Sequence, residues 1–331
     1  MRAATARAKQ SAKKALQHVR LQYLAQQDIA RFSRHAALST FDRDLPRVTS
    51  RIMYNVHALE KGLARNHDLR PGFGRKALTH LNDAMLLYRA SGYDLAAFPY
   101  QEGLGVLRRY ADLHERLGHD VDFLPAVVDP THFSAENAGS TTAGTIEVRR
   151  DQKQRNTSKN FAELALGRTS IREFSGDAID QTKVEDAIRV ALKSPSVCNR
   201  QGWRVHWLSD KTTMKEVLAH QRGFGYREMP EVLMCVTVSN STFISPVERN
   251  QGFVDGGLFA MSILYGLEYQ GLAAVPLNAC LYSGAQKAIR SIVPIPEAEV
   301  IVMFIAVGDF PESSQAPASS RKPLESVVVR H

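Results

Sequence analysis

Two arginines and two hydroxyl side chains are concentrated in one short segment of this sequence. Arg168, Thr169, Ser170 and Arg172 lie within five residues, directly before a stretch with an extended pattern. Alternation along an extended chain places Arg168, Ser170 and Arg172 on one side. Guanidinium groups bind phosphate through paired hydrogen bonds, and hydroxyls fill the remaining acceptor positions. The segment indicates an anion site, but a solvated charged strand would have the same composition.

A polar loop is expected at residues 194–203, between a helix and a strand. It contains Pro195, Ser196, Asn199 and Gln201. Because Asn and Gln carry both donor and acceptor atoms, they suit the edge of a heteroaromatic ring. An ordinary loop between a helix and a strand would look the same when taken alone.

A third segment, residues 271–278, has small side chains next to a buried strand. It runs Gly-Leu-Ala-Ala-Val-Pro-Leu-Asn and ends at Pro276, Leu277 and Asn278. Small residues allow a flat ligand to approach the backbone closely. Alone, this signal is weak.

The elements that must position these segments belong to a large globular chain. Its 331 residues are 44% hydrophobic and 23% charged, which fits two domains or one large domain and excludes collagen-like, coiled-coil or wholly disordered chains. The longest apolar runs, Val232–Val238 and Val300–Val307, are far shorter than the roughly 20 residues of a membrane span. Three cysteines without metal-ligand spacing predict no disulfide framework and no metal site, and favour a reducing compartment, the cytoplasm.

The spacing of apolar residues and the local composition predict two domains joined by a linker. Residues 1–133 have apolar side chains at helical spacing and predict an all-α N-terminal domain. Residues 134–160 are polar and predict an exposed linker. Residues 161–331 mix α and β patterns. Their expected elements are a helix opened by a capping box at Thr182–Glu185, strands at Trp203–Leu208, Glu231–Val238 and Val300–Val307, and a helix from Phe253 to Gln270 that Gly271 ends.

The net charge of +8 is concentrated toward the N-terminus, where the first acidic residue is Asp28. This basic, alanine-rich arm is interpreted as a solvated helix or frayed tail, with a transit peptide or a weak contact with a membrane surface as alternatives. It has no apolar core of a secretory signal. No motif that reads or stacks on bases accompanies the charge, so nucleic-acid binding is not expected.

Several further short motifs follow the three segments in order. They are Asp255-Gly256-Gly257, Gly271-Leu272, Val307-Gly308-Asp309-Phe310-Pro311 and Ser320-Arg321-Lys322-Pro323-Leu324. Together with Arg168-x-Ser170-x-Arg172-x-Phe174 and the loop 194–203, they resemble the FMN-dependent nitroreductase family. The resemblance covers about half of the chain, residues 161–331.

This resemblance implies an α+β fold: a mixed, mostly antiparallel sheet flanked by helices, preceded here by the all-α domain. It also implies a homodimer with FMN at the subunit interface. By position, Arg168, Thr169, Ser170 and Arg321 match phosphate and ribityl contacts, and Arg172 matches a positively charged residue near the flavin N1–C2=O edge. Pro195, Ser196, Asn199 and Gln201 match a loop that reaches FMN from the partner. Pro276, Leu277 and Asn278 match the segment near N5, and Arg172 and Asn278 are the expected catalytic residues.

The expected activity is that of an FMN-dependent oxidoreductase. By the resemblance, hydride passes in a ping-pong cycle from NAD(P)H through FMN to a small organic acceptor, and the cofactor supplies the chemistry. One alternative is a flavin oxidase or dehydrogenase that acts on a glycan- or peptide-linked biosynthetic intermediate. Another is a flavin-binding interaction module with little turnover.

The N-terminal domain has a sequence mark of its own. His57-Ala58-Leu59-Glu60-Lys61-Gly62-Leu63 is followed by Arg70-Pro71-Gly72-Phe73-Gly74, and both resemble helical extensions of some nitroreductase-like proteins. His57 and Glu60 lie three residues apart on one helical face. They predict either a wall of a substrate site or an ion-paired helix surface.

Overall fold

The computed structural model describes residues 2–65, 69–134, 139–225 and 227–331. By their contacts these residues form two compact units. The sheet unit comprises residues 1–31 and 149–313, and the helical unit comprises residues 32–148 and 314–331. These two units differ from the predicted domains at both ends of the chain. Residues 1–31 belong to the sheet unit, and residues 314–331 belong to the helical unit.

Three helices build the core of the helical unit. They are α2 (Leu45–Leu63), α3 (Arg75–Ala90) and α4 (Phe98–Arg116), which pack on one another in pairs. The short helix α5 (Leu124–Val127) packs against α3. The predicted helical spacing is confirmed, since Leu78, Leu81, Met85 and Tyr88 all lie buried in this core.

The basic arm forms one long helix, α1 (Arg2–His35). Near its end, the carboxylate of Asp28 accepts a hydrogen bond from Arg249 Nε at 2.8 Å, within the sheet unit. Several apolar side chains of the helix are exposed, among them Leu16, Val19 and Phe32. None of the described helices combines the length and apolar character that crossing a membrane requires.

A four-stranded sheet organises the sheet unit. Its order is β2-β3-β5-β4, and the three pairings are antiparallel. The strands are β2 (Trp203–Leu208), β3 (Val232–Ser239), β4 (Ala273–Asn278) and β5 (Glu299–Gly308). Every residue from Val232 to Val238 is buried, so this sheet is covered on both faces, as its continuous apolar pattern indicates. The expected fold class and the three strands predicted from the sequence are confirmed.

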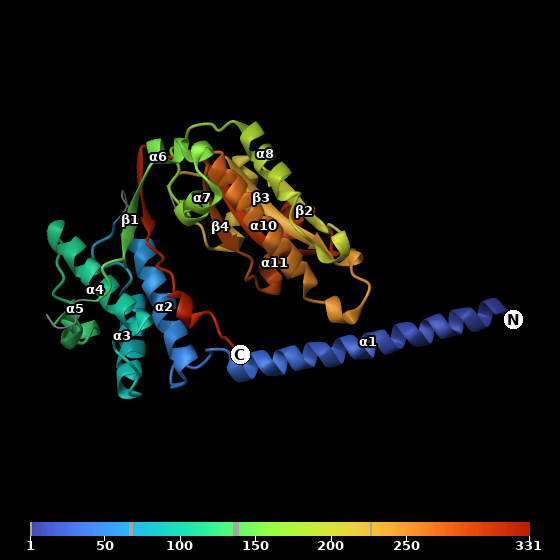
Figure 1. Ribbon diagram of the computed structural model, residues 1–331, viewed down its shortest axis with the longest axis horizontal. Helices are drawn as coiled ribbons and strands as arrows, with labels where there is room; N and C mark the ends of the chain where they lie inside the picture. The colour runs from blue at the N-terminus through green and yellow to red at the C-terminus, as the bar shows by residue number, and fades with distance from the viewer. Residues whose placement is uncertain (1, 66–68, 135–138, 226) are drawn as a thin grey trace. The chain divides into compact units, whose positions relative to one another are not determined.

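Helices flank this sheet. The central helix is α10 (Gln251–Tyr269), which packs on all four strands and lies beside α8 (Gln181–Ala191) in Figure 1. The shorter helices are α6 (Arg150–Gln154), α7 (Phe161–Gly167), α9 (Lys211–Gln221) and α11 (Ser283–Ile292). Gly271, with φ of +68°, follows α10 as predicted. The predicted cap of α8 is wrong, because the Asp180 carboxylate, and not the Thr182 hydroxyl, accepts the first free N–H.

The predicted linker 134–160 contains more structure than its composition indicates. Strand β1 (Thr145–Arg149) pairs with β6 (Ser313–Pro317) in a separate two-stranded sheet. Farther on, Lys153 and Asn156 are buried. The expectation of an exposed segment is therefore wrong for these residues, because a distant carboxylate makes burial of their polar groups possible.

Candidate functional site

The predicted anion segment leaves α7 as an extended chain beside β4. Its backbone is fixed by a hydrogen bond from Ile171 N to Ala274 O at 3.0 Å. The Arg168 guanidinium donates to Ser170 Oγ at 3.4 Å, and Arg172 donates to the carbonyl oxygen of Ser170 at 3.4 Å. Thr169 Oγ1 donates to the carbonyl of Gly167. Both guanidiniums and the Ser170 hydroxyl are thus gathered at one half-buried place.

A buried ion pair supports the start of this segment. Lys153 Nζ donates to the carbonyl of Gly167 at 2.8 Å and pairs with the carboxylate of Glu268. Asn156 Nδ2 donates to the same carboxylate at 3.1 Å. Burial lowers the pKa of Lys153, Glu268 opposes that shift, and the positive charges of Lys159 and Arg168 add to it. Lys153 is therefore paired with Glu268, and the positive charges of Lys159 and Arg168 lie close enough to act on it.

The loop 194–201 has a strained backbone and a fixed shape. Cys198, Asn199 and Gln201 all have positive φ values, between 49° and 54°. Such a conformation is costly for residues other than glycine and persists only where the surroundings enforce it. Here Ser196 Oγ accepts from Gln201 N at 2.9 Å, and Gln201 Nε2 donates to Asn199 Oδ1 at 3.1 Å. The polar side chains of the loop are therefore arranged before any ligand binds.

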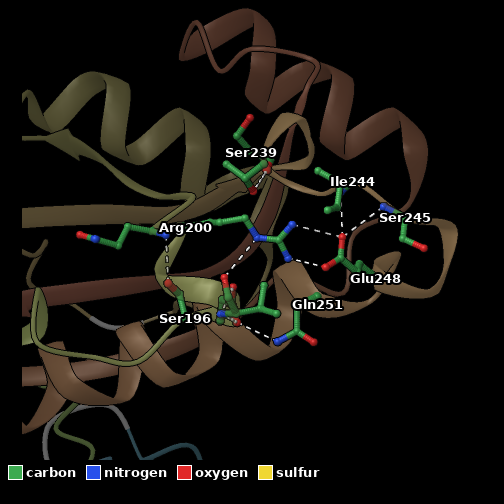
Figure 2. Close-up of polar contacts among 11 residues, drawn as sticks. Ser196, Arg200, Ser239, Ile244, Ser245, Glu248 and Gln251 are labelled. Atoms are coloured by element: carbon green, nitrogen blue, oxygen red, sulfur yellow. Dashed lines mark hydrogen bonds and ion pairs between the residues drawn. The ribbon is translucent and has the colours of Figure 1, made fainter.

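An ion pair and a buried acid hold this loop from outside, as Figure 2 shows for the labelled residues. The Arg200 guanidinium pairs with Glu248 and also donates to Val197 O at 3.1 Å. The hydrogen bond from Arg200 lowers the pKa of Glu248 to about 2. The carboxylate of Asp255, buried in α10, accepts from Val197 N at 3.3 Å. Sequence reasoning assigned no role to Arg200 or Glu248, whose separation of 48 residues gives no local signal.

The third predicted segment contains the whole of β4, and Pro276, Leu277 and Asn278 form the second half of this strand. Leu277 is buried, Pro276 is half-buried and Asn278 is exposed. The Oδ1 atom of Asn278 accepts from Cys280 N at 3.0 Å, and its carbonyl accepts from Gln221 Nε2 at 2.9 Å. The side-chain NH2 of Asn278 is then available as a donor at the sheet edge.

The chain brings two of the three segments together and separates the third. Residues 168–172 lie beside β4, which also carries Pro276 and Asn278. The loop 194–201 leads into β2, at the opposite edge of the sheet. Two strands lie between these edges, a separation of about 14 Å. Arg321 belongs to the helical unit, where it lines a cavity, and is not part of the sheet unit.

The two motifs of the N-terminal domain, residues 57–63 and 70–74, make contacts within the helical unit. His57 Nδ1 lies 3.5 Å from Glu60, whose buried carboxylate also accepts from Gly144 N at 3.3 Å. The ring of Phe73 packs so closely on Gly62 that a Cβ there would overlap it. The two motifs therefore meet in the core of the helical unit.

The donor groups of the candidate site are cations and amides. Across the described ranges, no three His, Cys, Asp or Glu side chains come together in a way that could hold a metal ion. The guanidiniums, ammonium groups and amides gathered here instead suit an organic anion.

Part of the sheet unit is similar to a known protein family. Residues 165–231, which include the anion segment and the loop 194–201, match the model of the nitroreductase family. The similarity to the nitroreductase family therefore lies within the sheet unit. The expected resemblance of the C-terminal half is thereby confirmed.

Two curated relatives of this nitroreductase domain are distant. Iodotyrosine deiodinase of Nematostella vectensis is 21% identical over 212 residues, which span 55% of this chain and 79% of that protein. A protein of Archaeoglobus fulgidus, assigned as an NADH dehydrogenase/NAD(P)H nitroreductase, is 24% identical over 142 residues, which span 43% and 80%. A solved structure from Desulfovibrio desulfuricans, assigned as a nitroreductase in complex with FMN, has a TM-score of 0.42 at 20% identity and covers 52% of this chain and 98% of that one.

Proposed function

We propose that the sheet unit binds FMN and works as an oxidoreductase that carries electrons from NAD(P)H to a small organic acceptor. One observation carries the proposal: the Arg168 guanidinium and the Ser170 hydroxyl lie together, with Lys153 and Lys159 nearby, within the segment that matches the nitroreductase family. A dianionic phosphate supplies the counter-charge that this cluster lacks.

The residues present fit the chemistry of FMN. Arg168, Thr169 and Ser170 offer guanidinium and hydroxyl donors for the phosphate and ribityl oxygens, and Lys153 and Lys159 add positive charge behind them. Arg172 lies two residues farther along the same extended segment. Pro195, Ser196, Asn199 and Gln201 form a preformed polar loop suited to the edge of the flavin ring.

Bound FMN would supply the redox chemistry, because it can take hydride from NAD(P)H and pass it on to the acceptor. The protein supplies position and electrostatics. Arg172 would supply a positive charge that stabilises the negative charge of the reduced flavin. Asn278, whose oxygen is already bonded to Cys280 N, offers its NH2 to the edge near N5. No side-chain acid or base is required for hydride transfer.

We propose a homodimer with FMN at the interface. Within one chain the loop 194–201 and the segment 168–172 lie at opposite sheet edges, so a second copy is needed to bring one beside the other. Exposed apolar side chains are available for this contact on α7 and α10, namely Phe161, Leu166, Phe253, Val254 and Leu258. Light scattering of the purified protein should give twice the mass of the chain.

The test of FMN binding is the visible absorption of the protein after purification with added FMN. We expect a flavin band that bleaches when NADH or NADPH is added without oxygen. The variant Arg168→Gln with Ser170→Ala should lose most of the flavin. The exposed Arg189→Gln on α8, outside the site, should keep it. Equal retention in both variants would show that the cluster does not hold the cofactor.

Initial-rate kinetics separate the proposed cycle from the alternatives. Parallel double-reciprocal lines for NAD(P)H and acceptor support a ping-pong exchange, and intersecting lines would refute it. A flavin band that does not bleach with either nucleotide would favour an oxidase of a biosynthetic intermediate.

Two exposed free thiols, Cys198 and Cys280, support the proposal that the protein works in the cytoplasm.

A further inference from the structure

The N-terminal helix α1 has a surface that the proposed function does not use. It is one uninterrupted helix of 34 residues, about 50 Å long (Figure 1). Between Arg2 and Arg34 the sequence contains eight Lys and Arg residues and a single acid, Asp28. Like charges close together on a helix repel one another, so this composition calls for an explanation outside the helix itself.

One face of α1 contacts the sheet unit. Leu24, Ala25 and Asp28 are half-buried, and they follow the three- and four-residue spacing of one helix face. The Asp28 carboxylate accepts from Arg249 Nε at 2.8 Å and from Asn250 Nδ2 at 3.3 Å, just before α10. The single acid of α1 is therefore already paired within the protein.

The opposite face of α1 exposes large apolar side chains. Leu16 is 70% exposed, and Val19 and Tyr23 are each 60% exposed. Their spacing of three and four residues places them in one row, on the far side of the helix from Ala25 and Asp28. A single exposed apolar residue is ordinary, but a row of three on one face is typical of a contact surface.

Basic side chains lie beside this apolar row. Lys9, Lys13 and Arg20 are exposed, and helical spacing places all three along one edge of the row. None of the three has an ion pair among the residues that the structure describes. An apolar helix face flanked by Lys and Arg is typical of helices that lie in the plane of an anionic membrane surface.

The charge of α1 argues for a lipid surface and against a second copy of the same helix. Two copies packed on this face would bring their Lys and Arg residues together, with no unpaired acid on either helix to compensate them. An anionic lipid surface supplies negative charge along the whole helix. Tyrosine, as at position 23, is also enriched at the boundary between headgroups and acyl chains.

We propose that α1 docks the protein on membranes rich in anionic phospholipid. Leu16, Val19 and Tyr23 enter the headgroup region, and the basic edge of the row pairs with the lipid phosphates. The contact involves none of the residues assigned to FMN, so it can be tested independently of the redox activity.

Sedimentation of the full chain with lipid vesicles tests the proposal. Vesicles of phosphatidylglycerol and phosphatidylcholine in equal amounts are compared with vesicles of phosphatidylcholine alone. We expect binding to the anionic vesicles only, and weaker binding as the salt concentration rises, because salt screens the attraction to surface charge. No binding to the anionic vesicles, or equal binding to both kinds, would overturn the proposal.

Charge variants locate the contact on α1. The triple variant Lys9→Gln, Lys13→Gln and Arg20→Gln should bind anionic vesicles about a hundredfold more weakly, since each basic residue near such a surface contributes about fivefold. The matched control removes the same charge from exposed positions outside α1 and should bind as the unchanged protein does; it is Lys183→Gln with Lys193→Gln and Lys215→Gln. Equal losses in the two variants would show attraction by net charge alone and would overturn docking by α1.

An apolar variant separates lipid docking from other contacts. Leu16→Gln with Val19→Gln and Tyr23→Gln leaves the charge unchanged and should weaken vesicle binding about tenfold or more. The mass from light scattering, the circular dichroism and the flavin content should all stay as they are. Vesicle binding that survives this variant would refute the proposal. A changed mass would refute it as well, because the row would then be a contact between copies of the chain.

Discussion

Each unit contains a buried glutamate, and the two carboxylates differ in how many partners they have. In the sheet unit, Glu268 is 4% exposed and contacts both Lys153 and Asn156. In the helical unit, Glu102 is 1% exposed and one of its oxygens has no partner in the described residues. The satisfied carboxylate fixes the beginning of a binding segment, whereas the unsatisfied one lies in the wall of a cavity. The first carboxylate has its counter-charge within the protein, and the second has no ion pair among the described residues.

The largest expected effect comes from breaking the satisfied pair. Glu268→Gln leaves the Lys153 ammonium buried without its counter-charge, so the free energy of unfolding should fall by about 3–5 kcal/mol. Urea unfolding of the purified protein measures this. The double variant Lys153→Met with Glu268→Leu should recover most of the loss, because it removes both charges. A loss below about 1 kcal/mol in the single variant would mean that the pair is not buried.

A smaller loss is expected where backbones touch in the helical unit. Gly105→Ala places a Cβ against the Ser140 carbonyl and should cost about 1–3 kcal/mol of stability. The midpoint temperature of thermal unfolding should fall. Gly284→Ala in α11 is the control, because nothing lies within 4 Å of the methyl group that it would add, and its stability should hold or rise slightly. Equal behaviour of the two alanines would contradict this close packing.

Removing the unsatisfied charge should cost little. Glu102→Gln keeps the shape of the side chain and removes the charge of a carboxylate that has one long donor contact, so stability should change by less than about 1 kcal/mol in either direction. The same denaturation assay compares it with Glu268→Gln. A destabilisation as large as that of Glu268→Gln would show that Glu102 has a protein partner.

The smallest effect is a pH dependence of the loop 194–201. Arg200 lowers the pKa of Glu248 from an ordinary value of 4.5 to about 2. Because the folded-state pKa is the lower one, this stabilisation is present above pH 4.5 and is lost as the pH falls toward 2. The fluorescence of Trp203, which stacks on Phe259 next to the loop, should report the change. Glu248→Gln should abolish this part of the titration, and an unchanged profile would assign it elsewhere.

Much of the architecture follows from local patterns. The bounds of β2, predicted as Trp203–Leu208, agree with the structure, and the apolar run in β3 predicts a strand covered on both faces. Such patterns are readable because burial repeats along the element itself. The cap of α8 does not follow from the sequence, since Asp180 and Thr182 are both good capping residues and only the geometry selects between them. Nor does the burial of Lys153, because a polar segment gives no sign that Glu268, far along the chain, will pair with it.

The order of residue types along the chain was enough to identify an α+β nitroreductase domain behind a set of helices. It also led to the predictions for the segment 168–172, the polar loop and the end of β4, because the residues of each are neighbours in the sequence. Long-range pairing could not be read in this way. Which charges are neutralised, as at Lys153–Glu268 and Arg200–Glu248, and which are left open, as at Glu102, depends on groups that only folding brings together. Charge interactions act through space, and the linear sequence gives no distances between residues remote from each other.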